Sequence, residues 1–590
     1  MSNTLPEMFF DYVRKFDPEK EIFFTKLDDD YIPFSLNEFV KDVYKVINYF
    51  RANGINKGDR ISIISENRKE WAVVDFACIF MNIISVPVYT SLSAEQTEYI
   101  LRDSSAKVCF VSGSFLLEKV LSRIEDLPEL KNMVVFNDIN PDNYNRNIKL
   151  FSDIIDSGIN NSFKEIIDSL DVLSSHIKNR DLVTIIYTSG TTGNPKGVML
   201  SHKNLSSNLL ACRKVLTINE SDRFLSYLPY SHAYERLAGY YLAFFSGAQI
   251  YFAQSIETLS VQMREVRPTI IITVPRLLDK LYSRIMKSPE DLSSGIQKKI
   301  FLAAISTAKD GSISKKSLRW KLADKLVYRK IREKTGGALR FLVSGGGALN
   351  KNIGEFFERI GLTVLEGYGM TETSPVISVN SPGSNKYGTV GKPLQGVQLR
   401  FTSENEITVK GDLVMEGYYM DPASTSETIK DGWLYTGDIG EMDSDGFLKI
   451  TDRKKSLFKS SGGKYVSPTH IEEIVSHIDY IENVMVIGNE RLFVTALIVP
   501  VKNELIKFAK DNGIIHDSFR ELVRDKNLIK LIKRDIDSAQ SALSNYERIR
   551  KFILTERSFA VESGELTPTM KIKRAFVEKL YKDEIDEMYK

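Results

Sequence analysis

The apolar residues of the first 130 positions recur in short runs that predict strands and helices in alternation. Three β-branched and apolar runs have the length of strands, namely residues 61–64, 85–88 and 107–111. Residues 71–83 carry an apolar face at helical spacing, and residues 94–102 form a second expected helix with Ser93 as its cap. Strands and helices in this order predict a parallel sheet covered by helices.

The middle of the chain continues the pattern with more strands, expected at residues 181–186, 198–200, 269–274, 339–343 and 362–365. One helix face is marked by Leu205, Leu209, Cys212 and Leu216. Residues 138–180 are rich in Asn, Asp and Ser, so we expect loops with one short helix there. The lysine-rich residues 287–335 are prone to form helices, and the sequence leaves open whether they are a solvated insertion or an interaction surface.

The pattern changes twice in the last 200 residues. Residues 395–450 show short strands between Gly/Asp turns, which predict a small β-rich subdomain. After Asp452, a helix beginning at Pro468 is followed by an expected hairpin about Gly488-Asn489 and by a strand near residues 552–554. We therefore expect an α/β protein with a large N-terminal domain, residues 1–452, and a small α+β C-terminal domain, residues 453–590.

Composition and charge then narrow the class of protein. A chain of 590 residues is too long for one hydrophobic core, and its 43% hydrophobic and 26% charged residues are typical of a soluble globular protein. A net charge of +2 gives no indication of a nucleic-acid partner. Three widely spaced cysteines indicate neither a disulfide framework nor a zinc site, which fits a reducing compartment.

The N-terminus lacks a basic region followed by a long apolar core, so we expect no secretory signal. The most apolar stretch, residues 237–252, is broken by Ser246-Gly247 and is too short to span a membrane. A cytoplasmic location is expected. Peripheral contact with the inner face of the membrane and a homodimer stay open.

A loop rich in glycine and hydroxyl groups, residues 187–197, follows the strand at residues 181–186. Its glycines permit tight turns, and its backbone N–H groups, hydroxyls and single lysine suit a polyphosphate. The loop differs from a Walker A motif because Pro195 precedes Lys196 and Gly197 follows it. The alternative interpretation is a mobile turn between two strands.

Four further segments accompany this loop: residues 367–373 (Gly-Tyr-Gly-Met-Thr-Glu-Thr), 434–438 (Leu-Tyr-Thr-Gly-Asp), 451–454 (Thr-Asp-Arg-Lys) and 567–574 (Thr-Pro-Thr-Met-Lys-Ile-Lys-Arg). In order and spacing, the five segments resemble the core motifs of the adenylate-forming (AMP-binding) superfamily. Residues 225–236, 431–439 and 447–455 look like its long-chain fatty acyl-CoA synthetase branch. The resemblance covers about residues 30–580.

The resemblance implies a large adenylate-forming domain with an acyl-binding site, followed by a small mobile C-terminal domain. It further implies an ATP-dependent fatty acid–CoA ligase for long or medium chains that forms acyl-AMP and pyrophosphate, then acyl-CoA and AMP. Fatty acid, ATP and CoA would be its substrates, with Mg²⁺ as cofactor. An acyl carrier protein ligase, another carboxylate-adenylating enzyme and a non-catalytic nucleotide-binding module stay open as alternatives.

By the same resemblance, Glu372 is the expected magnesium ligand, with Thr188 near the metal. Tyr368 would present its ring to adenine, Asp438 would accept hydrogen bonds from the ribose hydroxyls, and Arg453 would reach the ribose or a phosphate. The alternatives are a core tyrosine, a turn aspartate and a salt-bridged hinge arginine. The full nucleotide-binding set implied is Thr188, Ser189, Gly190, Thr191, Thr192, Gly193, Lys196, Gly345, Gly367, Tyr368, Gly369, Met370, Thr371, Asp438 and Arg453.

Lys571 is the expected catalytic cation, because a flexible ammonium can bridge the α-phosphate and the carboxylate as charge shifts in the transition state. The family pattern has Gly before this lysine where this chain has Met570, and nearby Lys573 is the competing candidate. His232 is the third expected catalytic residue, as a gate beside the acyl pocket. The alternative for His232 is a packed core histidine.

Asp452 is the expected hinge about which the C-terminal domain reorients between the two half-reactions. A glycine-containing basic loop just beyond it is an expected CoA contact, formed by Ser461, Gly462, Gly463 and Lys464, with a plain surface turn as the alternative. The preferred acyl chain length does not follow from the sequence. The expected border of the acyl tunnel is Tyr227, Tyr234, Leu237 and Tyr240.

Overall fold

The first large sheet contains the five strands predicted at residues 61–64, 85–88, 107–111, 181–186 and 198–200, together with three strands that were not predicted. The computed structural model describes residues 4–144, 147–188, 194–288, 294–454, 458–459, 465–560, 563–567 and 571–590. In spatial order the strands are β19 (Gly417–Tyr418), β9 (Lys196–Ser201), β8 (Leu182–Thr188), β4 (Ile84–Val88), β3 (Arg60–Ile64), β5 (Val108–Val111), β6 (Asn132–Val135) and β7 (Ile148–Leu150). Every pair from β8 to β7 is parallel, which confirms the predicted parallel sheet, and β9 and β19 add antiparallel strands at one edge.

Helices connect these strands, as the sequence predicts. They are α1 (Leu5–Lys15), α2 (Leu36–Ala52), α3 (Lys69–Met81), α4 (Ala94–Asp103), α5 (Ser114–Leu121), α6 (Phe151–Ile155), α7 (Phe163–Ser174) and α8 (His202–Leu216), with short 3₁₀ turns at η1 (Ile124–Asp126) and η2 (Pro141–Asn143). Ser93 caps α4 through a reciprocal capping box with Gln96, as expected.

The expectation of loops with one short helix at residues 138–180 is wrong, because the structure has β7 and two helices, α6 and α7, in this segment. Ser162 and Glu165 form a capping box that starts α7, and Ile166 and Leu170 bury the helix against the core. The polar composition of the segment therefore belongs to the exposed face of a helix and its flanking turns.

A second large sheet lies beside the first. Its strands in spatial order are β16 (Lys392–Pro393), β15 (Val376–Val379), β14 (Val364–Gly369), β13 (Phe341–Ser344), β12 (Ile270–Thr273), β10 (Arg223–Ser226), β11 (Gln249–Phe252), β1 (Glu21–Leu27) and β2 (Asp30–Ser35). Its helices are the π-helix η3 (Glu235–Tyr241), α9 (Leu242–Phe245), α10 (Leu259–Val266), α11 (Pro275–Lys287) and α15 (Lys351–Arg359), with a 3₁₀ turn at η6 (Thr371–Thr373). The apolar stretch at residues 237–252 is thus η3, α9 and β11, broken at Ser246-Gly247.

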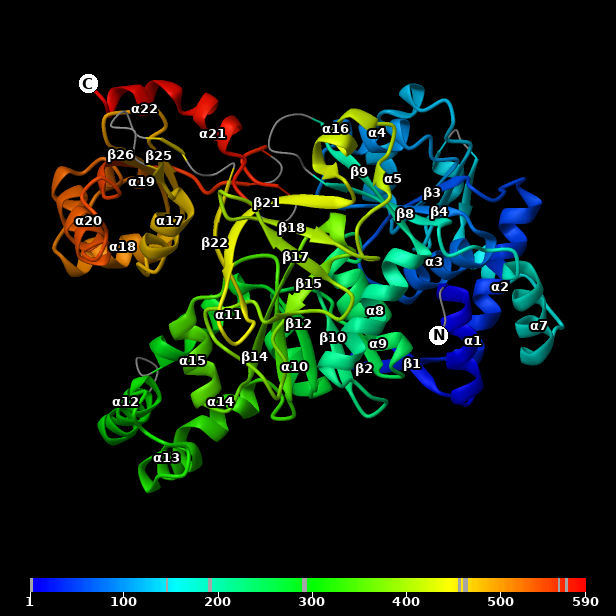
Figure 1. Ribbon diagram of the computed structural model, residues 1–590, viewed down its shortest axis with the longest axis horizontal. Helices are drawn as coiled ribbons and strands as arrows, with labels where there is room; N and C mark the ends of the chain where they lie inside the picture. Colours follow the sequence, from blue (N-terminus) through cyan, green and yellow to red (C-terminus); the bar gives the residue numbers. More distant parts are fainter. Residues whose placement is uncertain are drawn as a thin grey trace.

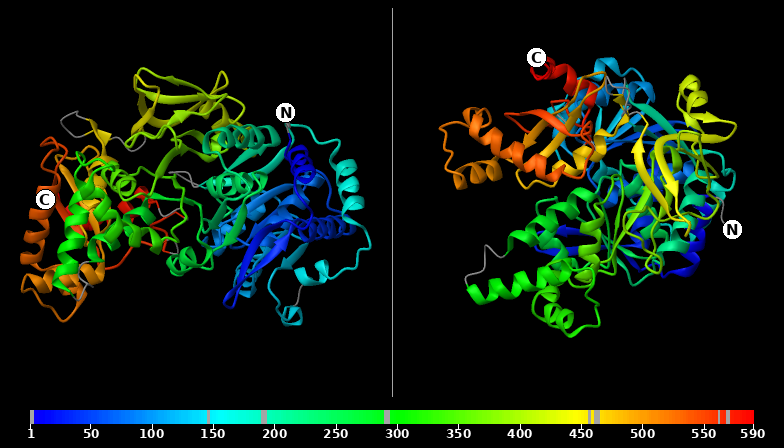
Figure 2. Two further views of the ribbon diagram at one scale, coloured as in Figure 1. Left: turned by 90° about the horizontal axis from the view of Figure 1, so that it is seen from below. Right: turned by 60° about the vertical axis from the view of Figure 1, so that its left-hand side comes forward.

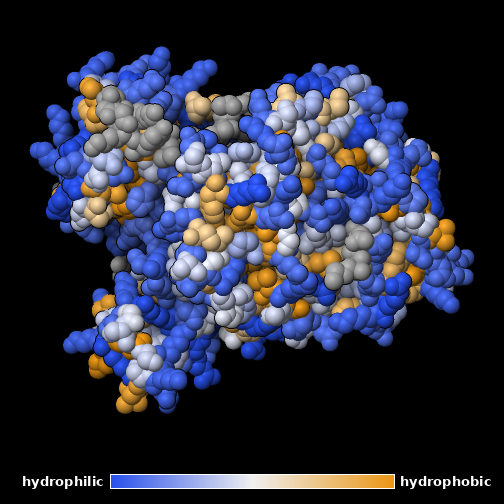
Figure 3. Space-filling view, viewed as in Figure 1, coloured by the Kyte–Doolittle hydropathy of each residue, from blue (hydrophilic) through white to orange (hydrophobic). Residues whose placement is uncertain are grey.

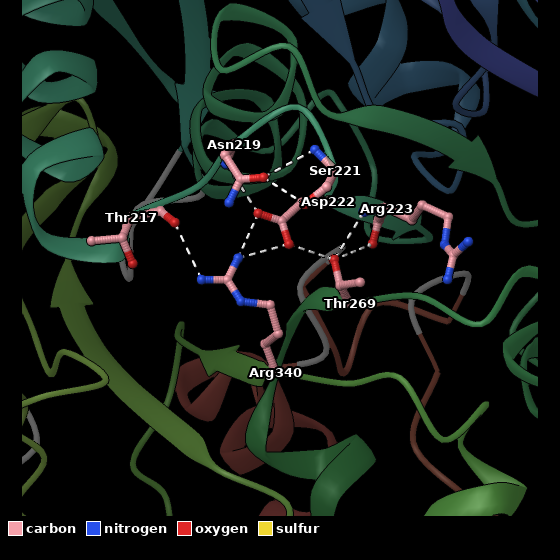
Figure 4. Close-up of polar contacts among 7 residues, drawn as sticks. All are labelled: Thr217, Asn219, Ser221, Asp222, Arg223, Thr269 and Arg340. Atoms are coloured by element: carbon pink, nitrogen blue, oxygen red, sulfur yellow. Dashed lines mark hydrogen bonds and ion pairs between the residues drawn. The ribbon is translucent and has the colours of Figure 1, made fainter.

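A polar network fixes the starting ends of three neighbouring strands of this sheet (Figure 4). Asp222, which is buried, accepts hydrogen bonds from Thr269 Oγ1 at 2.7 Å and from Arg340 Nη1 at 2.6 and 2.7 Å. These residues precede β10, β12 and β13, respectively. One buried carboxylate thereby holds the three strands in register.

A buried ion pair joins the two sheets' layers. Asp75 on α3 pairs with Arg236 on η3, and the hydroxyl of Tyr241 donates to Asp75 at 2.7 Å. Arg236 also donates to hydroxyls on β4 and β8, Ser85 and Thr184, each at 2.8 Å. Both charges are almost inaccessible to solvent, so their partners compensate for the lost hydration.

The β-rich subdomain predicted at residues 395–450 is confirmed as a third sheet. Its strands are β17 (Gln398–Phe401), β18 (Glu406–Lys410), β21 (Trp433–Met442), β20 (Ile429–Lys430) and β22 (Leu448–Arg453), and α16 (Pro422–Thr428) lies before β20. The long strands β21 and β22 run toward the C-terminal part of the chain (Figure 1).

The C-terminal part has the predicted α+β composition and its own hydrophobic core. Its strands are β23 (Phe458–Lys459), β24 (Tyr465–Val466), β25 (Ile481–Ile487), β26 (Val494–Pro500) and β27 (Ile549–Leu554), and β25 and β26 form the expected hairpin. Its helices are α17 (Pro468–Ser476), α18 (Lys502–Asp511), α19 (Phe519–Leu522), α20 (Lys526–Ala539), α21 (Arg574–Leu580) and α22 (Lys582–Glu587).

This part packs on the second sheet's helices, as the turned views show (Figure 2). Arg276 on α11 pairs with Glu482 at 3.1 Å, and Lys287 pairs with Glu504 at 2.7 Å. The basic segment at residues 287–335 is helical as expected, with α12 (Gly295–Lys309), α13 (Leu318–Ala323), the π-helix η5 (Asp324–Tyr328) and α14 (Arg329–Lys334) in its described portion. Among the helices that the structure describes, none has both the length and the apolarity needed to cross a bilayer.

Candidate functional site

Three strands bring Tyr368, Asp438 and Arg453 together. Tyr368 lies at the end of β14, Asp438 in the middle of β21, and Arg453 at the end of β22, directly across from Asp438 in the antiparallel pair. Asp438 accepts a hydrogen bond from the Tyr368 hydroxyl at 2.6 Å and another from Arg453 Nε at 2.7 Å. Asp438 is buried while Arg453 is half exposed, so the carboxylate is fixed and its positive partner faces the solvent side.

The environment of this trio keeps Arg453 charged and Tyr368 neutral. The carboxylate of Asp438 raises the pKa of Arg453, and burial followed by the charge of Asp438 raises the pKa of the Tyr368 phenol. Tyr368 therefore stays neutral and donates its proton. A rigid carboxylate with one aromatic and one cationic neighbour can bind a ligand that carries hydroxyl groups.

Glu372 is a second buried carboxylate, on η6 just beyond β14. Its Oε1 accepts a 2.9 Å hydrogen bond from the hydroxyl of Tyr418. Burial raises the pKa of Glu372, while its hydrogen bonds and the charge of Arg453 oppose that change. Burial favours the neutral form of Glu372, and a cation bound beside it would favour the charged form instead.

Lys196 and Thr188 stand opposite each other at the start of β9 and the end of β8. The ammonium of Lys196 donates to Ser424 Oγ at 2.5 Å and lies 5.2 Å from the ring centroid of Tyr418. Because Tyr418 also contacts Glu372, one tyrosine links the base of the glycine-rich loop to the second buried carboxylate. The other predicted loop residues, Ser189, Gly190, Thr191, Thr192 and Gly193, lie outside the described part of the chain.

Lys571 reaches this region from the C-terminal part. Its backbone is held by Thr567, whose N–H donates to the Lys571 carbonyl at 2.8 Å and whose Oγ1 accepts from the Lys571 N–H at 3.0 Å. Crowding by surrounding protein atoms, followed by the charge of Arg453, lowers the pKa of Lys571 although the residue is exposed to solvent, and Asp438 and Glu372 raise it. The ammonium is thus within electrostatic range of both buried carboxylates. Lys573 instead forms the N-cap of α21, and its N–H donates to the Glu565 carbonyl at 2.8 Å.

His232 faces the same place from the turn after β10. Its Nδ1 accepts a hydrogen bond from the Tyr234 N–H at 3.2 Å, and its ring stands edge-on to Tyr89 at 6.4 Å. Burial, assisted by the charge of Lys571, lowers the pKa of His232 to about 4. The ring is therefore neutral near pH 7, and it lies against Tyr89 within electrostatic range of Lys571.

The predicted glycines mark close approaches of the chain. A Cβ on Gly369 would lie 1.7 Å from the Pro375 carbonyl oxygen, and one on Gly345 would lie 2.8 Å from the Tyr234 ring. A Cβ on Gly367 would lie 3.3 Å from Cγ2 of Val379, a tight contact that would require Val379 to shift slightly. The N–H of Met370 donates to Pro375 at 2.9 Å, and the Thr371 carbonyl accepts from Ser374 at 3.2 Å, which closes the turn that carries Glu372.

Asp452 adjoins the site but points away from Asp438. Its Oδ1 accepts a hydrogen bond from the Arg453 N–H at 2.7 Å. Burial raises the pKa of Asp452, and a hydrogen bond with Ser467, the N-cap of α17, opposes this rise. Asp452 thus connects the last strand of the third sheet to the first long helix of the C-terminal part. The expected CoA residues Ser461, Gly462, Gly463 and Lys464 lie outside the described residues.

The sequence analysis missed Tyr418 and Ser424, which contact Glu372 and Lys196. Tyr418 lies 46 positions from Glu372 along the chain, so no local pattern points to it. The antiparallel pairing of β19 with β9 brings Tyr418 beside Val198 and so into this region.

Comparisons with known proteins show what the chain is similar to. Residues 10–419 match the model of the AMP-binding enzyme family, and residues 456–590 match that of the AMP-binding enzyme C-terminal domain. The chain is 33% identical to long-chain-fatty-acid–CoA ligase FadD15 of Mycobacterium bovis, over 100% of this chain and 97% of the relative. It is also 33% identical to the peroxisomal long chain acyl-CoA synthetase 7 of Arabidopsis thaliana, over 91% of this chain and 79% of the relative.

A solved structure shares the fold at lower identity. The adenylation domain of a carboxylate reductase from Mycobacterium chelonae superposes with a TM-score of 0.76 at 22% identity, covering 99% of this chain and 91% of that domain. The predicted class is confirmed: an α/β fold with a large N-terminal part and a smaller C-terminal domain.

Proposed function

The chain belongs to the AMP-binding enzyme family, and we propose that it is an ATP-dependent long-chain fatty acid–CoA ligase. The likeness over the full chain to curated long-chain-fatty-acid–CoA ligases carries this assignment. A carboxylate oxygen of the fatty acid bonds to the α-phosphorus of ATP, and the bond to pyrophosphate breaks. The thiol sulfur of CoA then bonds to the acyl carbon, and AMP leaves with the electron pair.

The first step brings two anions together, so it depends on neutralising charge. The fatty acid is already ionised near neutral pH and needs no general base. We assign this neutralisation to Lys571, whose ammonium lies within electrostatic range of Asp438 and Glu372. The lysine would bridge the α-phosphate and the acyl carboxylate, a contact that strengthens as negative charge shifts between them.

Asp438, Tyr368 and Arg453 would hold the nucleotide. In this proposal Asp438 accepts hydrogen bonds from the ribose hydroxyls. The 2.6 Å hydrogen bond from Tyr368 holds the carboxylate of Asp438 in position for this role. Gly367 and Gly369 let the chain approach adenine beside the Tyr368 ring, and Arg453 reaches the ribose or a phosphate. Thr188 and Lys196, at the two ends of the glycine-rich loop, would face the β- and γ-phosphates.

Glu372 fits a magnesium ion because it is a buried carboxylate whose pKa burial raises. Mg²⁺ prefers few carboxylates together with phosphate oxygens and water, so Glu372, with Thr188 nearby, would hold it against the phosphates. When bound, the ion supplies positive charge to the departing pyrophosphate. Tyr418 would orient the carboxylate through its 2.9 Å hydrogen bond.

The second step requires a different arrangement of the C-terminal part. We assign the hinge to Asp452, between β22 and α17, so that Lys571 withdraws and another face of the domain meets the acyl-adenylate. His232, neutral at pH 7, would gate the acyl pocket between the two steps. We place the boundary between the two moving parts at residues 452 and 453.

Release of AMP measured across a series of free fatty acids of increasing length tests this function. With ATP, Mg²⁺ and CoA, long-chain acids should give the highest kcat/KM, and AMP should form in step with acyl-CoA. Replacing CoA by a phosphopantetheinylated acyl carrier protein distinguishes the acceptor. Absence of fatty acid-dependent ATP–pyrophosphate exchange would show a nucleotide-binding module without this activity.

A further inference from the structure

The helical lobe, defined as residues 294–335, carries an unusual share of the chain's positive charge. It contains twelve lysines and arginines against three acidic residues, a net charge of +9, whereas the whole chain carries +2. The rest of the protein is therefore net negative. A surface this basic attracts anionic partners over a distance of about 10 Å at moderate salt.

The lobe also exposes large apolar side chains in a regular row. Leu318, Leu322 and Leu326 recur every fourth residue along α13 and η5 and are 74%, 53% and 45% exposed. The opposite side of the same helix is buried in the protein core through Ala323, Val327 and Ile331. The helix thus has its own core contacts, and folding does not explain the outer leucines.

A second helix of the lobe, α12, also exposes apolar side chains beside lysines. On α12, Ile296, Ile300 and Leu302 are exposed beside Lys298 and Lys299. Figure 1 shows α12 and α13 projecting at the lower left, away from the first sheet, and Figure 3 shows apolar residues at the tip of this projection among hydrophilic ones. Apolar side chains interleaved with lysines are typical of helices that lie in a membrane interface.

Positive side chains flank the leucine row and lead to an arginine-lined pocket. Lys321, Lys325 and Arg329 recur every fourth residue beside the leucines, and all three are exposed. Arg329 also lines a pocket of about 470 Å³ between α10 and α14, together with Arg264, Arg267, Arg332, Glu333, Gly336 and Gly337. The pocket lining contains four arginines and one carboxylate, Glu333, which pairs with Arg329 at 3.2 Å. Arg332 pairs with Asp324, outside the lining, at 2.6 Å.

We propose that the helical lobe docks the protein on an anionic lipid bilayer. Leu318, Leu322 and Leu326 enter the interface, the lysines beside them neutralise lipid phosphates, and the arginine pocket takes one phosphate-bearing headgroup. The charge favours an anionic partner, and the exposed leucines distinguish a lipid surface from a nucleic acid, whose phosphate backbone offers them no apolar contact. The proposal is independent of the ligase reaction.

Co-sedimentation of the full-length protein with vesicles tests the docking. Vesicles of phosphatidylcholine alone are compared with vesicles that contain about one quarter phosphatidylserine, at low and high salt. We expect binding only to the anionic vesicles and weaker binding as salt rises. The double variant Lys321→Glu/Lys325→Glu should bind at least about 25-fold more weakly, because each basic residue near an anionic surface strengthens binding about fivefold.

The apolar part of the surface has its own variant and controls. Leu318→Ser/Leu322→Ser/Leu326→Ser should also lose about tenfold in vesicle binding, since the buried apolar area in the interface falls. The matched controls are Leu492→Ser/Ile515→Ser, whose side chains are at least as exposed as the three leucines, and Lys526→Glu/Lys530→Glu, all in the C-terminal part. These should bind vesicles like the wild type.

All variants should keep wild-type AMP release on detergent-dispersed fatty acid, which separates this test from the test of the enzymatic function. Equal binding to both kinds of vesicle, no binding to either, or lobe variants that bind like the controls would each overturn the proposal. Binding of an acidic protein or a nucleic acid to the lobe without vesicle binding would also overturn it.

Discussion

The hydroxyl of Tyr368 donates a 2.6 Å hydrogen bond to Oδ2 of Asp438. The two residues are 70 positions apart, on β14 of the second sheet and β21 of the third. The contact therefore fixes the position of the β-rich subdomain against the strand end that carries Glu372. The other oxygen of Asp438, Oδ1, accepts a hydrogen bond from Arg453 Nε. The carboxylate is therefore oriented before any ligand binds.

Asp438→Asn should weaken ATP binding by about ten- to a hundredfold, because hydrogen bonds to a charged acceptor contribute about 1.5–3 kcal/mol. The amide keeps the shape of the side chain but removes the charge that Arg453 faces. The measurement is the Kd for ATP by calorimetry. Asp445→Asn, at an exposed turn of the same subdomain, is the control and should bind ATP like the wild type. Unchanged affinity in Asp438→Asn would refute the assigned role.

Glu372→Gln should raise the Mg²⁺ concentration that gives half-maximal adenylation by about tenfold or more, since a neutral amide is a poor ligand for this ion. The titration is followed by ATP–pyrophosphate exchange at saturating fatty acid. Glu427→Gln, an exposed residue on α16, serves as the control. An identical magnesium profile for Glu372→Gln and the control would remove Glu372 from the metal site.

Glu235 predicts a dependence of stability on pH. Burial raises the pKa of this carboxyl from 4.5 to about 8, although Ser226 donates to it at 2.6 Å. Because the folded pKa is the higher one, the contribution of Glu235 to stability is fully present below about pH 4.5 and is lost as pH rises through about 8. Glu235→Gln does not titrate, so its melting temperature relative to wild type should increase over this range.

Thermal unfolding at several pH values between about 4.5 and about 9 measures this difference. Glu427→Gln is again the matched control, since it lies at the surface. A constant difference in melting temperature between Glu235→Gln and the wild type would show that the buried carboxyl does not titrate in this range.

Asp222→Ala should lower the free energy of unfolding of the N-terminal part by about 3 kcal/mol, because Thr269 and Arg340 both lose a buried acceptor. Denaturant unfolding gives the value. Asp11→Ala removes an exposed ion pair with Arg14 and should cost less than about 1 kcal/mol. Equal effects of the two substitutions would mean that the network in Figure 4 does not hold the strands.

Sequence patterns predicted the parts of this fold that local spacing determines. The parallel strands β3, β4 and β5 and the cap of α4 follow from short apolar runs and a Ser-x-x-Gln signal. For residues 138–180 one short helix among loops was predicted, whereas the structure has β7, α6 and α7 there, because the polar composition suggested loops although Ser162 and Glu165 form the same kind of capping box. The paired strands β1 and β2 near the N-terminus were not predicted either.

The candidate site likewise contains residues that sequence motifs identify and residues that only long-range contacts bring in. Tyr368, Glu372 and Asp438 lie in short motifs that the sequence displays, and the roles assigned to them stay predictions. Tyr418 joins Glu372 to Lys196 only through the pairing of β19 with β9, which no local spacing encodes. The approach of Lys571 depends on how the C-terminal part packs, through pairs such as Arg276 with Glu482. Contacts between distant elements are therefore what the structure adds.

The central claim is that Lys571, carried by the C-terminal domain, supplies the positive charge for adenylation. Fatty acid-dependent ATP–pyrophosphate exchange by Lys571→Ala tests it most directly, with Lys573→Ala as the matched control. We predict that exchange falls by about 10²- to 10³-fold in Lys571→Ala while its Kd for ATP changes less than about tenfold, and that Lys573→Ala stays near the wild type. Near-normal exchange in Lys571→Ala, with the loss appearing in Lys573→Ala instead, would contradict the account.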